Sequence, residues 1–545
     1  MATTSKTKKI KNNRNLFFSG VAVLTFTNVL NKVVGMLFRI PISNILGDSG
    51  MAYFNAAYHI FVWFYMISTG GLPLAVSILV SEARFRGNRE EIKRIYSLTM
   101  KMFIVIGTLG TAVMMLLSHQ FAFLNGVAGS YLSIIAVAPT LFLVCVASAM
   151  RGYFQGFQEM RPTAVSQIME TLGKLLMGIL LALGARKLGY GLEVQAACAI
   201  AGLTIGTAFG MLFLFISKLR FHEEEYAIEG AVGGGKISGG REILRRLLVI
   251  AIPITVSSSI MSLTTMVDDM IINWRLMSIG YVEEYANALY GNYTGFAVPF
   301  ANLPPALIYP ISYSLIPLLK GTLTLGDSRR SAEICRSCLR VTAIVALPCT
   351  LGVSVLSEPL LKLLYNAESS ELSAPKLSVL AISIFFICML SISNAILQAY
   401  GRQNKPIISL VSGSVVKIML SFVLIGIPAI NIYGAPISTV VCYIICTVLN
   451  VYFMAKYTDV RPSVFVTFVK PLIASAVCVG GAFGMIRLLS GYLPSKAVTL
   501  IAIAVAAIIY VIVLFTIRGV ERDDILMLPK GAKIYAGLQK ARLVK

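Results

Sequence analysis

The sequence predicts an all-α polytopic membrane protein with about fourteen transmembrane helices, in two parallel six-helix lobes plus two C-terminal helices. Three observations carry this prediction. First, 57% of the 545 residues are hydrophobic and 13% are charged, whereas soluble chains are about 45–50% apolar and about 25% charged. Second, apolar runs long enough to cross a bilayer recur along the whole chain. Third, the charges follow the positive-inside rule for an even number of spans.

The apolar runs reach the length of about 20 residues that a helix needs to cross the bilayer core. No polar stretch between them has the size of a soluble catalytic domain. The fourteen expected spans cover residues 17–41, 53–80, 96–117, 129–150, 162–185, 194–217, 247–272, 287–318, 338–357, 377–398, 406–427, 432–455, 465–486 and 497–517.

The net charge of +22 comes from 47 Lys and Arg against 25 Asp and Glu. In a soluble protein this excess would suggest a nucleic-acid partner. With both termini in the cytoplasm, however, nearly all of the excess falls in cytoplasmic segments, and the external segments are close to neutral. The charge therefore indicates membrane orientation, and no nucleic-acid partner is expected.

An internal similarity divides the first twelve spans into two sets of six. The turns at 153–162 and 397–406 are short, polar and glycine-containing, and each has a basic residue just before its final proline. Lys174 and Lys417 follow these prolines at nearly the same distance. Because both sets have six spans, they share one orientation in the membrane, which is the parallel kind of repeat.

The domain prediction follows from this division and from the long polar loop after the sixth span. We expect a basic cytoplasmic N-terminus at 1–16, an N-lobe at 17–217, a cytoplasmic linker at 218–246, a C-lobe at 247–456, two added spans within 457–517, and a basic cytoplasmic tail at 518–545.

A weaker similarity joins the second and eighth spans. The second contains Gly70-Gly71-Leu72-Pro73, and the eighth contains Asn302-Leu303-Pro304-Pro305. Proline inside a span interrupts the helical hydrogen bonds. We therefore expect a kink or a cavity at both places.

Ionisable side chains inside a span are costly and suggest function. In the first span, Asn28, Lys32, Gly35 and Arg39 are spaced by four, three and four residues, which places them on one helix face. One interpretation is a cationic wall that binds an anion. The alternative is that Arg39 reaches the outer surface and Lys32 pairs with a carboxylate.

Glu170 and Lys174 are four residues apart in the order that favours an ion pair within one helix, so they form either a self-neutralising pair or part of an anion site. Lys417 has no acid at the matching position and is the better anion-binding candidate. The adjacent Asp268 and Asp269 point about 100° apart. They are expected to form a charge pair or gate, one of them with Lys32 or Arg39, with ion coupling as the alternative.

His59 is interpreted as a packing histidine, with a proton-linked role as its alternative. No nucleotide-binding loop or zinc-protease motif is present, and we expect no catalytic residue, metal or cofactor. Energy for transport would then come from the membrane potential or from a gradient of an unidentified ion.

The segment from Arg151 to Glu170 resembles the signature of the stage V sporulation protein B and polysaccharide-exporter branch of the multidrug/oligosaccharidyl-lipid/polysaccharide flippase superfamily. The first span is similar to a basic stretch of the MurJ lipid II flippases, with Lys32 in place of an arginine and Arg39 one position further along. The resemblance covers about residues 17–517.

The resemblance implies lobes around a central cavity, and a monomer in the bacterial cytoplasmic membrane. Its expected partners are an undecaprenyl-linked saccharide, the bilayer and enzymes of wall synthesis. The expected function is a flippase for a cell-wall or spore-cortex precursor, acting by alternating access. A multidrug cation antiporter of the same fold is the first alternative, and a membrane scaffold or enzyme of wall assembly is the second.

Overall fold

The computed structural model describes residues 2–221, 239–324, 327–458, 460, 463–517 and 519–520. Within these residues every regular element is a helix, and eleven helices are long and apolar enough to cross a membrane. The all-α polytopic class is therefore confirmed, while the expected number of fourteen is approximate. Most of the linker at 218–246 and nearly all of the tail at 518–545 lie outside the described residues.

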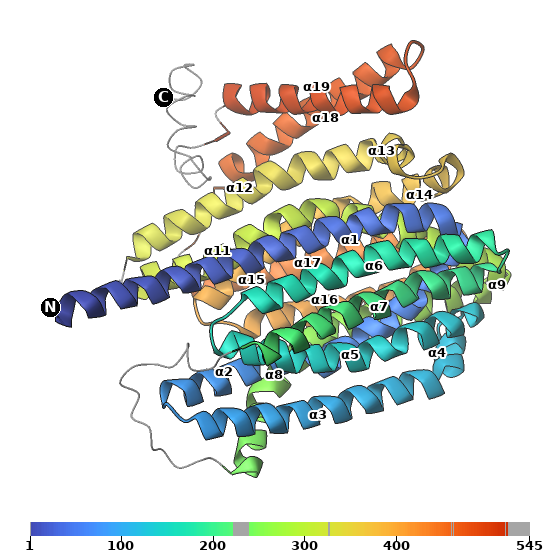
Figure 1. The fold of residues 1–545 in the computed structure, drawn as a ribbon. Helices are drawn as coiled ribbons and strands as arrows, with labels where there is room; N and C mark the ends of the chain where they lie inside the picture. Colours follow the sequence, from blue (N-terminus) through green and yellow to red (C-terminus); the bar gives the residue numbers. More distant parts are fainter. Residues whose placement is uncertain are drawn as a thin grey trace. The chain divides into compact units, whose positions relative to one another are not determined.

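The chain forms two compact units. Unit 1 runs to Met277 and also includes Tyr281–Gly291, and unit 2 holds Ser278–Gly280 and the chain from Asn292 onward. The lobe boundary expected in the linker stays a prediction. The helices of unit 1 (Figure 1) are α1 (Ala2–Thr69), α2 (Leu72–Phe85), α3 (Arg89–Leu116), α4 (Ser118–Leu124), η1 (Ala128–Ser130), α5 (Tyr131–Gly156), α6 (Arg161–Lys187), α7 (Leu192–Leu219), nearly all of α8 (Gly240–Ser278) and most of α9 (Glu283–Asn292).

Two glycine sites shape α1 and α2. Gly47 has φ of 65°, which only glycine adopts readily, and it separates the first two spans within α1. The helix is interrupted again after Thr69, and α2 begins at Leu72 just before Pro73. A Cβ on Gly71 would lie 2.3 Å from the carbonyl oxygen of Ala251 in α8. The expected break in the second span is therefore confirmed, and the backbone of α8 packs closely against it.

Glycines also set the distance between α6 and α7. A Cβ on Gly202 would lie 2.3 Å from the backbone nitrogen of Gly178, and one on Gly206 would lie 2.4 Å from the carbonyl oxygen of Glu170. Small residues let membrane helices approach to backbone contact. This close packing fixes α6, which carries Glu170 and Lys174, against α7 along much of its length (Figure 1).

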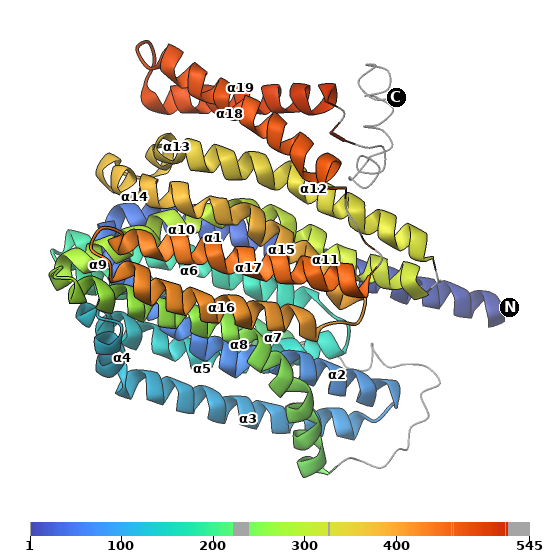
Figure 2. The same cartoon turned by 180° about the vertical axis from the view of Figure 1, so that it is seen from behind.

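Unit 2 contains the remaining helices. Its eighth span is built from several short pieces, and the chain breaks at Asn302, one residue before Leu303-Pro304, as the sequence predicts. The elements (Figure 2) are η3 (Tyr293–Ala297, a π-helix), α10 (Val298–Ala301), α11 (Leu303–Thr324), α12 (Ser328–Val355), α13 (Ser357–Leu364), α14 (Ala367–Leu380), α15 (Ile382–Ala399), α16 (Asn404–Ile425), η4 (Asn431–Tyr433), α17 (Gly434–Tyr457), η5 (Phe465–Val469, a π-helix), α18 (Lys470–Leu489) and α19 (Ser495–Thr516).

Hydrogen bonds between side chains join neighbouring helices of unit 2. Ser421 of α16 and Ser438 of α17 share a hydrogen bond of 2.7 Å. Tyr510 of α19 donates to the carbonyl oxygen of Ile344 in α12 over 2.6 Å, and this bond ties the last helix to the unit. Large apolar side chains, among them Leu500 and Ile512 of α19, remain about 60% exposed. In a polytopic protein such surfaces face lipid.

Candidate functional site

A buried ion pair joins α5 to α6 in unit 1. The Nη2 of Arg151 lies 2.8 Å from Oε2 of Glu170, and Arg151 also donates from Nε to the Ser166 hydroxyl over 3.2 Å. Thr207 of α7 donates to the other oxygen of Glu170 at 3.4 Å. The charge of Glu170 is therefore balanced from α5, and the ion pair of Glu170 is with Arg151 rather than with Lys174. The roles of Glu170 and Lys174 stay predictions.

Lys174 lies one turn further along α6, against aromatic rings of α1. Its ammonium nitrogen is 4.9 Å from the centre of the Phe38 ring and 5.1 Å from the centre of the Tyr58 ring. Among the described residues, no carboxylate lies within ion-pair distance of this ammonium group. Aromatic faces attract a cation without neutralising it. Lys174 thus presents a positive charge that a bound anion could still balance.

Arg39 brings a second cation to the same ring. Its guanidinium carbon lies 6.0 Å from the centre of the Tyr58 ring, and its side chain is half-buried. Arg39 and Lys174, predicted separately as cationic residues, are thus brought together around Tyr58. Two positive charges on one ring in a membrane-embedded unit form an arrangement that favours an anionic group.

The remaining members of the first-span stripe can be placed only on the backbone. Asn28 and Lys32 belong to α1, and their side chains lie outside what the structure describes. A Cβ built on Gly35, on the same stripe, would meet nothing within 4 Å. At this position the helix thus has room for a side chain. The roles of Asn28 and Lys32 stay predictions.

A second acid–base pair links α1 to α8. Nδ1 of His59 lies 2.5 Å from Oδ2 of Asp269, and both Asp268 and Asp269 are 4% exposed. The sequence predicts that one of Asp268 and Asp269 pairs with Lys32 or Arg39. The structure pairs Asp269 with His59, which the sequence indicates as a packing histidine. The gating role of Asp268 and Asp269 stays a prediction.

Lys417 occupies the repeat-related position in unit 2. It is half-buried on α16, within electrostatic range of Tyr443 on α17, which also has Tyr309 of α11 as a neighbour. In each unit, a lysine thus lies on the helix that follows the Pro-containing turn.

Sequence reasoning missed three buried cations, Arg151, Arg340 and Lys376, of which the first and last lie next to a predicted span end. Arg151 was assigned to a cytoplasmic turn because the fourth span was expected to end at 150, but α5 continues to Gly156 and leaves Arg151 only 8% exposed. Lys376 was placed just outside a span expected to begin at 377. It lies inside α14, is 2% exposed, and donates to Oδ1 of Asn292 over 2.9 Å.

Arg151 and Lys376 each had a signal in the sequence. Arg151 opens the motif that ends with Glu170, so its partner closes the same segment. Lys376 follows Ser369 and Ser373 at helical spacing. Both serines contact Asn292: its Nδ2 donates to the carbonyl oxygen of Ser369 at 3.0 Å, and the Ser373 hydroxyl donates to its Oδ1 at 2.7 Å.

The sequence matches the models of known protein families. The model of the polysaccharide biosynthesis protein family matches residues 17–322, which is more than half of the chain. The chain belongs to that family. A second model, MatE, matches residues 294–423 in the part that forms unit 2. Both matches place the protein in the multidrug/oligosaccharidyl-lipid/polysaccharide flippase superfamily, as the signature from Arg151 to Glu170 predicts.

Two curated proteins of Bacillus subtilis (strain 168) are similar over nearly the whole length of this family member. Stage V sporulation protein B is 24% identical over 531 residues, covering 95% of this chain and 98% of the relative. Lipid II flippase MurJ is 24% identical over 511 residues, covering 90% and 93%. The similarity thus includes the C-terminal helices as well as the two sets of six.

Solved structures share the fold. The inward closed conformation of lipid II flippase MurJ has a TM-score of 0.69 at 14% identity, covering 90% of this chain and 98% of that one. The inward-facing conformation of a multidrug resistance MATE family transporter has a TM-score of 0.65 at 13% identity, covering 78% and 94%. At these identities the likeness concerns the fold alone, and it confirms the predicted architecture of a polytopic helical membrane protein.

Proposed function

We propose that this protein is a flippase that moves an undecaprenyl-(pyro)phosphate-linked saccharide from the cytoplasmic to the outer leaflet for cell-wall or spore-cortex synthesis. The observation that carries the proposal is the pair of cations around Tyr58. Lys174 and Arg39 lie inside a membrane-embedded unit and suit a phosphate group, which lysine binds as a point charge. The lipid tail stays in the bilayer while the polar head crosses within the protein.

The relatives support the same substrate class. One is named lipid II flippase and another is a sporulation protein. Lys32, Arg39, Lys174 and Lys417, with Asn28, are the proposed substrate-binding residues. Glu170, Asp268 and Asp269 have the proposed role of charge pairing and gating. The protein is proposed to act without catalytic residues or cofactor, as a monomer that works beside enzymes of wall synthesis.

The proposed location is the bacterial cytoplasmic membrane, with both termini in the cytoplasm. A cytoplasm-negative potential favours outward movement of an anion by about 2.3 kcal/mol per charge per 100 mV. Alternating access of the two lobes would use this potential, and an ion gradient is the further source of energy. Na⁺ and H⁺ gradients imposed separately on proteoliposomes distinguish these sources.

A multidrug cation antiporter is the second candidate function. The MatE model and the MATE-family structure support it. Such a transporter needs carboxylates that are available to cations or protons. In unit 1, Glu170 is already paired with Arg151, and Asp269 is bonded to His59. These pairs favour the flippase.

The test is translocation by the purified full chain in proteoliposomes. Fluorescent lipid II, undecaprenyl pyrophosphate without sugar, and a cationic drug are supplied in parallel. The proposal expects both polyprenyl lipids to cross in a protein-dependent manner and the drug to remain. Transport of the drug with neither lipid moving would contradict the proposal and favour the antiporter. A protein that moves none of the three would favour the alternative of a scaffold or enzyme of wall assembly.

A further inference from the structure

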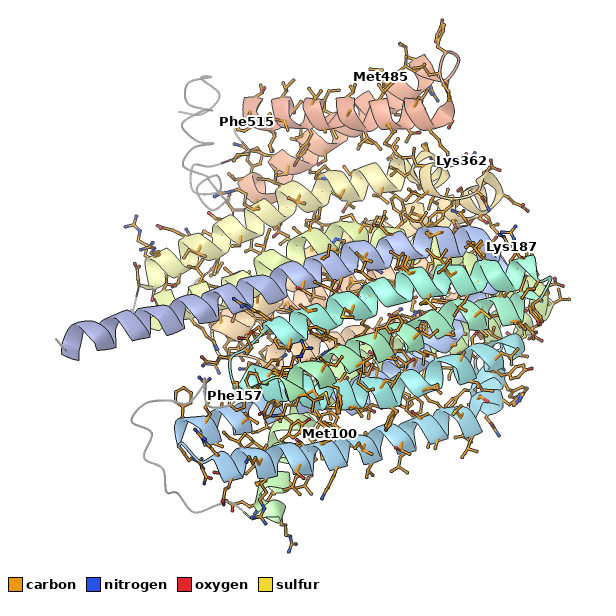
Figure 3. All side chains as sticks on the ribbon, viewed as in Figure 1. Met100, Phe157, Lys187, Lys362, Met485 and Phe515 are labelled. Carbon is orange, nitrogen blue, oxygen red and sulfur yellow. The ribbon has the colours of Figure 1, made fainter. Side chains whose placement is uncertain are left out.

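A groove of about 640 Å³ lies in unit 1, between α2 and the turn that joins α5 to α6. One wall is the face of α2 that carries Ser77, Ser81 and Phe85. The other wall is the turn with Gln155 and Gln158. Phe157, which is labelled in Figure 3, belongs to this turn. The volume is within the range of about 300–1,000 Å³ that small-molecule sites occupy. The groove lies well away along α6 from Lys174, so it is a separate feature.

Two glycines of α5, Gly152 and Gly156, bring the helix that leads into this turn close to α2. A Cβ on Gly152 would lie 2.6 Å from the carbonyl oxygen of Pro73, and one on Gly156 would lie 2.6 Å from Cβ of Val80. Only glycine lets α5 approach α2 this closely. Arg84 then donates to the carbonyl oxygen of Phe157 over 2.7 Å and holds the turn against α2.

The polar side chains of the groove keep their hydrogen-bonding capacity. Ser77, Ser81, Gln155 and Gln158 make no side-chain hydrogen bond to any other residue in the described part of the chain. Two hydroxyls and two carboxamides supply both donors and acceptors. They line one groove and are open to a ligand that carries many hydroxyl groups.

The charges beside the groove balance one another. Nη2 of Arg246 lies 2.5 Å from Oε2 of Glu82, and Nη2 of Arg86 lies 3.3 Å from the same oxygen. Nη1 of Arg86 lies 3.7 Å from Oε2 of Glu91. Glu82 and Arg86, the two charged residues that line the groove, thus each have an oppositely charged partner. This pairing distinguishes them from Lys174.

The remaining lining is apolar. Phe85 is 58% exposed, and Ile78 and Met160 complete this side of the groove. A sugar ring has hydroxyl groups at its edge and an apolar C–H face. We propose that this groove binds the neutral sugar rings of the substrate head group in one step, and that the cations around Tyr58 bind its phosphates in another. This inference rests on the proposed flippase function and divides recognition of the head group between two sites.

The test compares two ligands for the full chain in detergent micelles. Lipid II and undecaprenyl pyrophosphate, which differ in the sugar-bearing head group, are titrated by microscale thermophoresis. The variant Ser81→Ala/Gln155→Ala removes one hydroxyl and one carboxamide from the groove. Because each lost hydrogen bond weakens binding several-fold, lipid II affinity should fall about tenfold. Affinity for undecaprenyl pyrophosphate should stay within about twofold.

The matched control is Ser97→Ala/Gln120→Ala, which removes the same groups from exposed positions of α3 and α4 outside the groove. It should leave both affinities unchanged. If the groove variant unfolds, Gln158→Gly serves instead, because it removes an exposed carboxamide at a φ of 62° that glycine adopts freely. It should weaken lipid II binding selectively, by about threefold.

A groove variant that binds lipid II as tightly as the wild type overturns the inference. So does a variant that loses affinity for both lipids equally, since the groove would then not distinguish the sugar. In both cases the wild type still binds polyprenyl pyrophosphates, and the flippase proposal stands. A wild-type protein that binds neither lipid contradicts the flippase proposal itself.

Discussion

The two units hold their buried lysines in different ways. In unit 1, Lys174 lies half-buried on the Phe38 and Tyr58 rings, while the nearby Glu170 is bonded to Arg151. In unit 2, Lys376 is 2% exposed and donates to Asn292. An aromatic face leaves the positive charge unbalanced, whereas a buried carboxamide fixes the lysine in place. We therefore propose that Lys174 serves a ligand, whereas the contacts of Lys376 serve the fold.

The largest expected effect comes from breaking the ion pair between Arg151 and Glu170. Glu170→Ala leaves the buried guanidinium of Arg151 without a counter-charge and should destabilise the protein by about 3–5 kcal/mol. Replacing both partners, in Arg151→Met/Glu170→Met, should restore most of that stability because no charge remains unpaired. The midpoint of thermal unfolding in detergent measures both. A Glu170→Ala variant as stable as the wild type would show that the ion pair does not stabilise the protein.

A smaller effect is expected for Lys376. Lys376→Ala should destabilise the protein by about 2–3 kcal/mol, because it empties a fully buried position and removes the hydrogen bond to Asn292. The affinity for undecaprenyl pyrophosphate should stay within about twofold. The midpoint of thermal unfolding checks the loss of stability, and a titration with undecaprenyl pyrophosphate checks the affinity. Loss of affinity with unchanged stability would reverse the roles assigned to Lys376 and Lys174.

The smallest effect concerns an exposed cluster on α13 and α14 of unit 2. Lys362 (Figure 3) donates to Glu358 and to Glu371, each over 2.7 Å. These hydrogen bonds raise the pKa of Lys362. The stabilisation is therefore present at pH 7 and is lost as the pH rises through this raised pKa, above about 10.4. Because an exposed ion pair contributes less than about 1 kcal/mol to the free energy of unfolding, the expected loss of stability is small.

The measurement is the unfolding midpoint at pH 8 and at pH 11, for the wild type and for Lys362→Met. The wild type should lose slightly more stability over this interval than the variant, since only it has the titrating lysine. Equal losses in the two proteins would show that the cluster does not contribute.

The helices could be predicted from the sequence because hydrophobic length is a local property. The fifth and sixth spans, expected at 162–185 and 194–217, correspond to α6 and α7 within a few residues. The breaks at Gly71 and Asn302 were also predictable, since proline and glycine act on their own helix. Local chemistry thus accounts for most of the architecture.

The partners of the buried charges could not be predicted in the same way. His59 and Asp269 are 210 residues apart, and their pairing depends on which helices pack together. Arg151 and Lys376 were missed because each lies one residue beyond an expected span end, where a side chain is assumed to reach water. A one-residue error in a boundary therefore turned two buried cations into surface residues.

The central claim is that Lys174 presents an available cation to a phosphate-bearing lipid. Its most direct test is the affinity of Lys174→Met for undecaprenyl pyrophosphate, with Lys174→Arg as the matched variant that keeps the charge. Lys174→Met should bind at least tenfold more weakly, with an unchanged unfolding midpoint, and Lys174→Arg should retain most of the affinity. Wild-type affinity in a folded Lys174→Met protein would show that Lys174 does not bind the phosphate group.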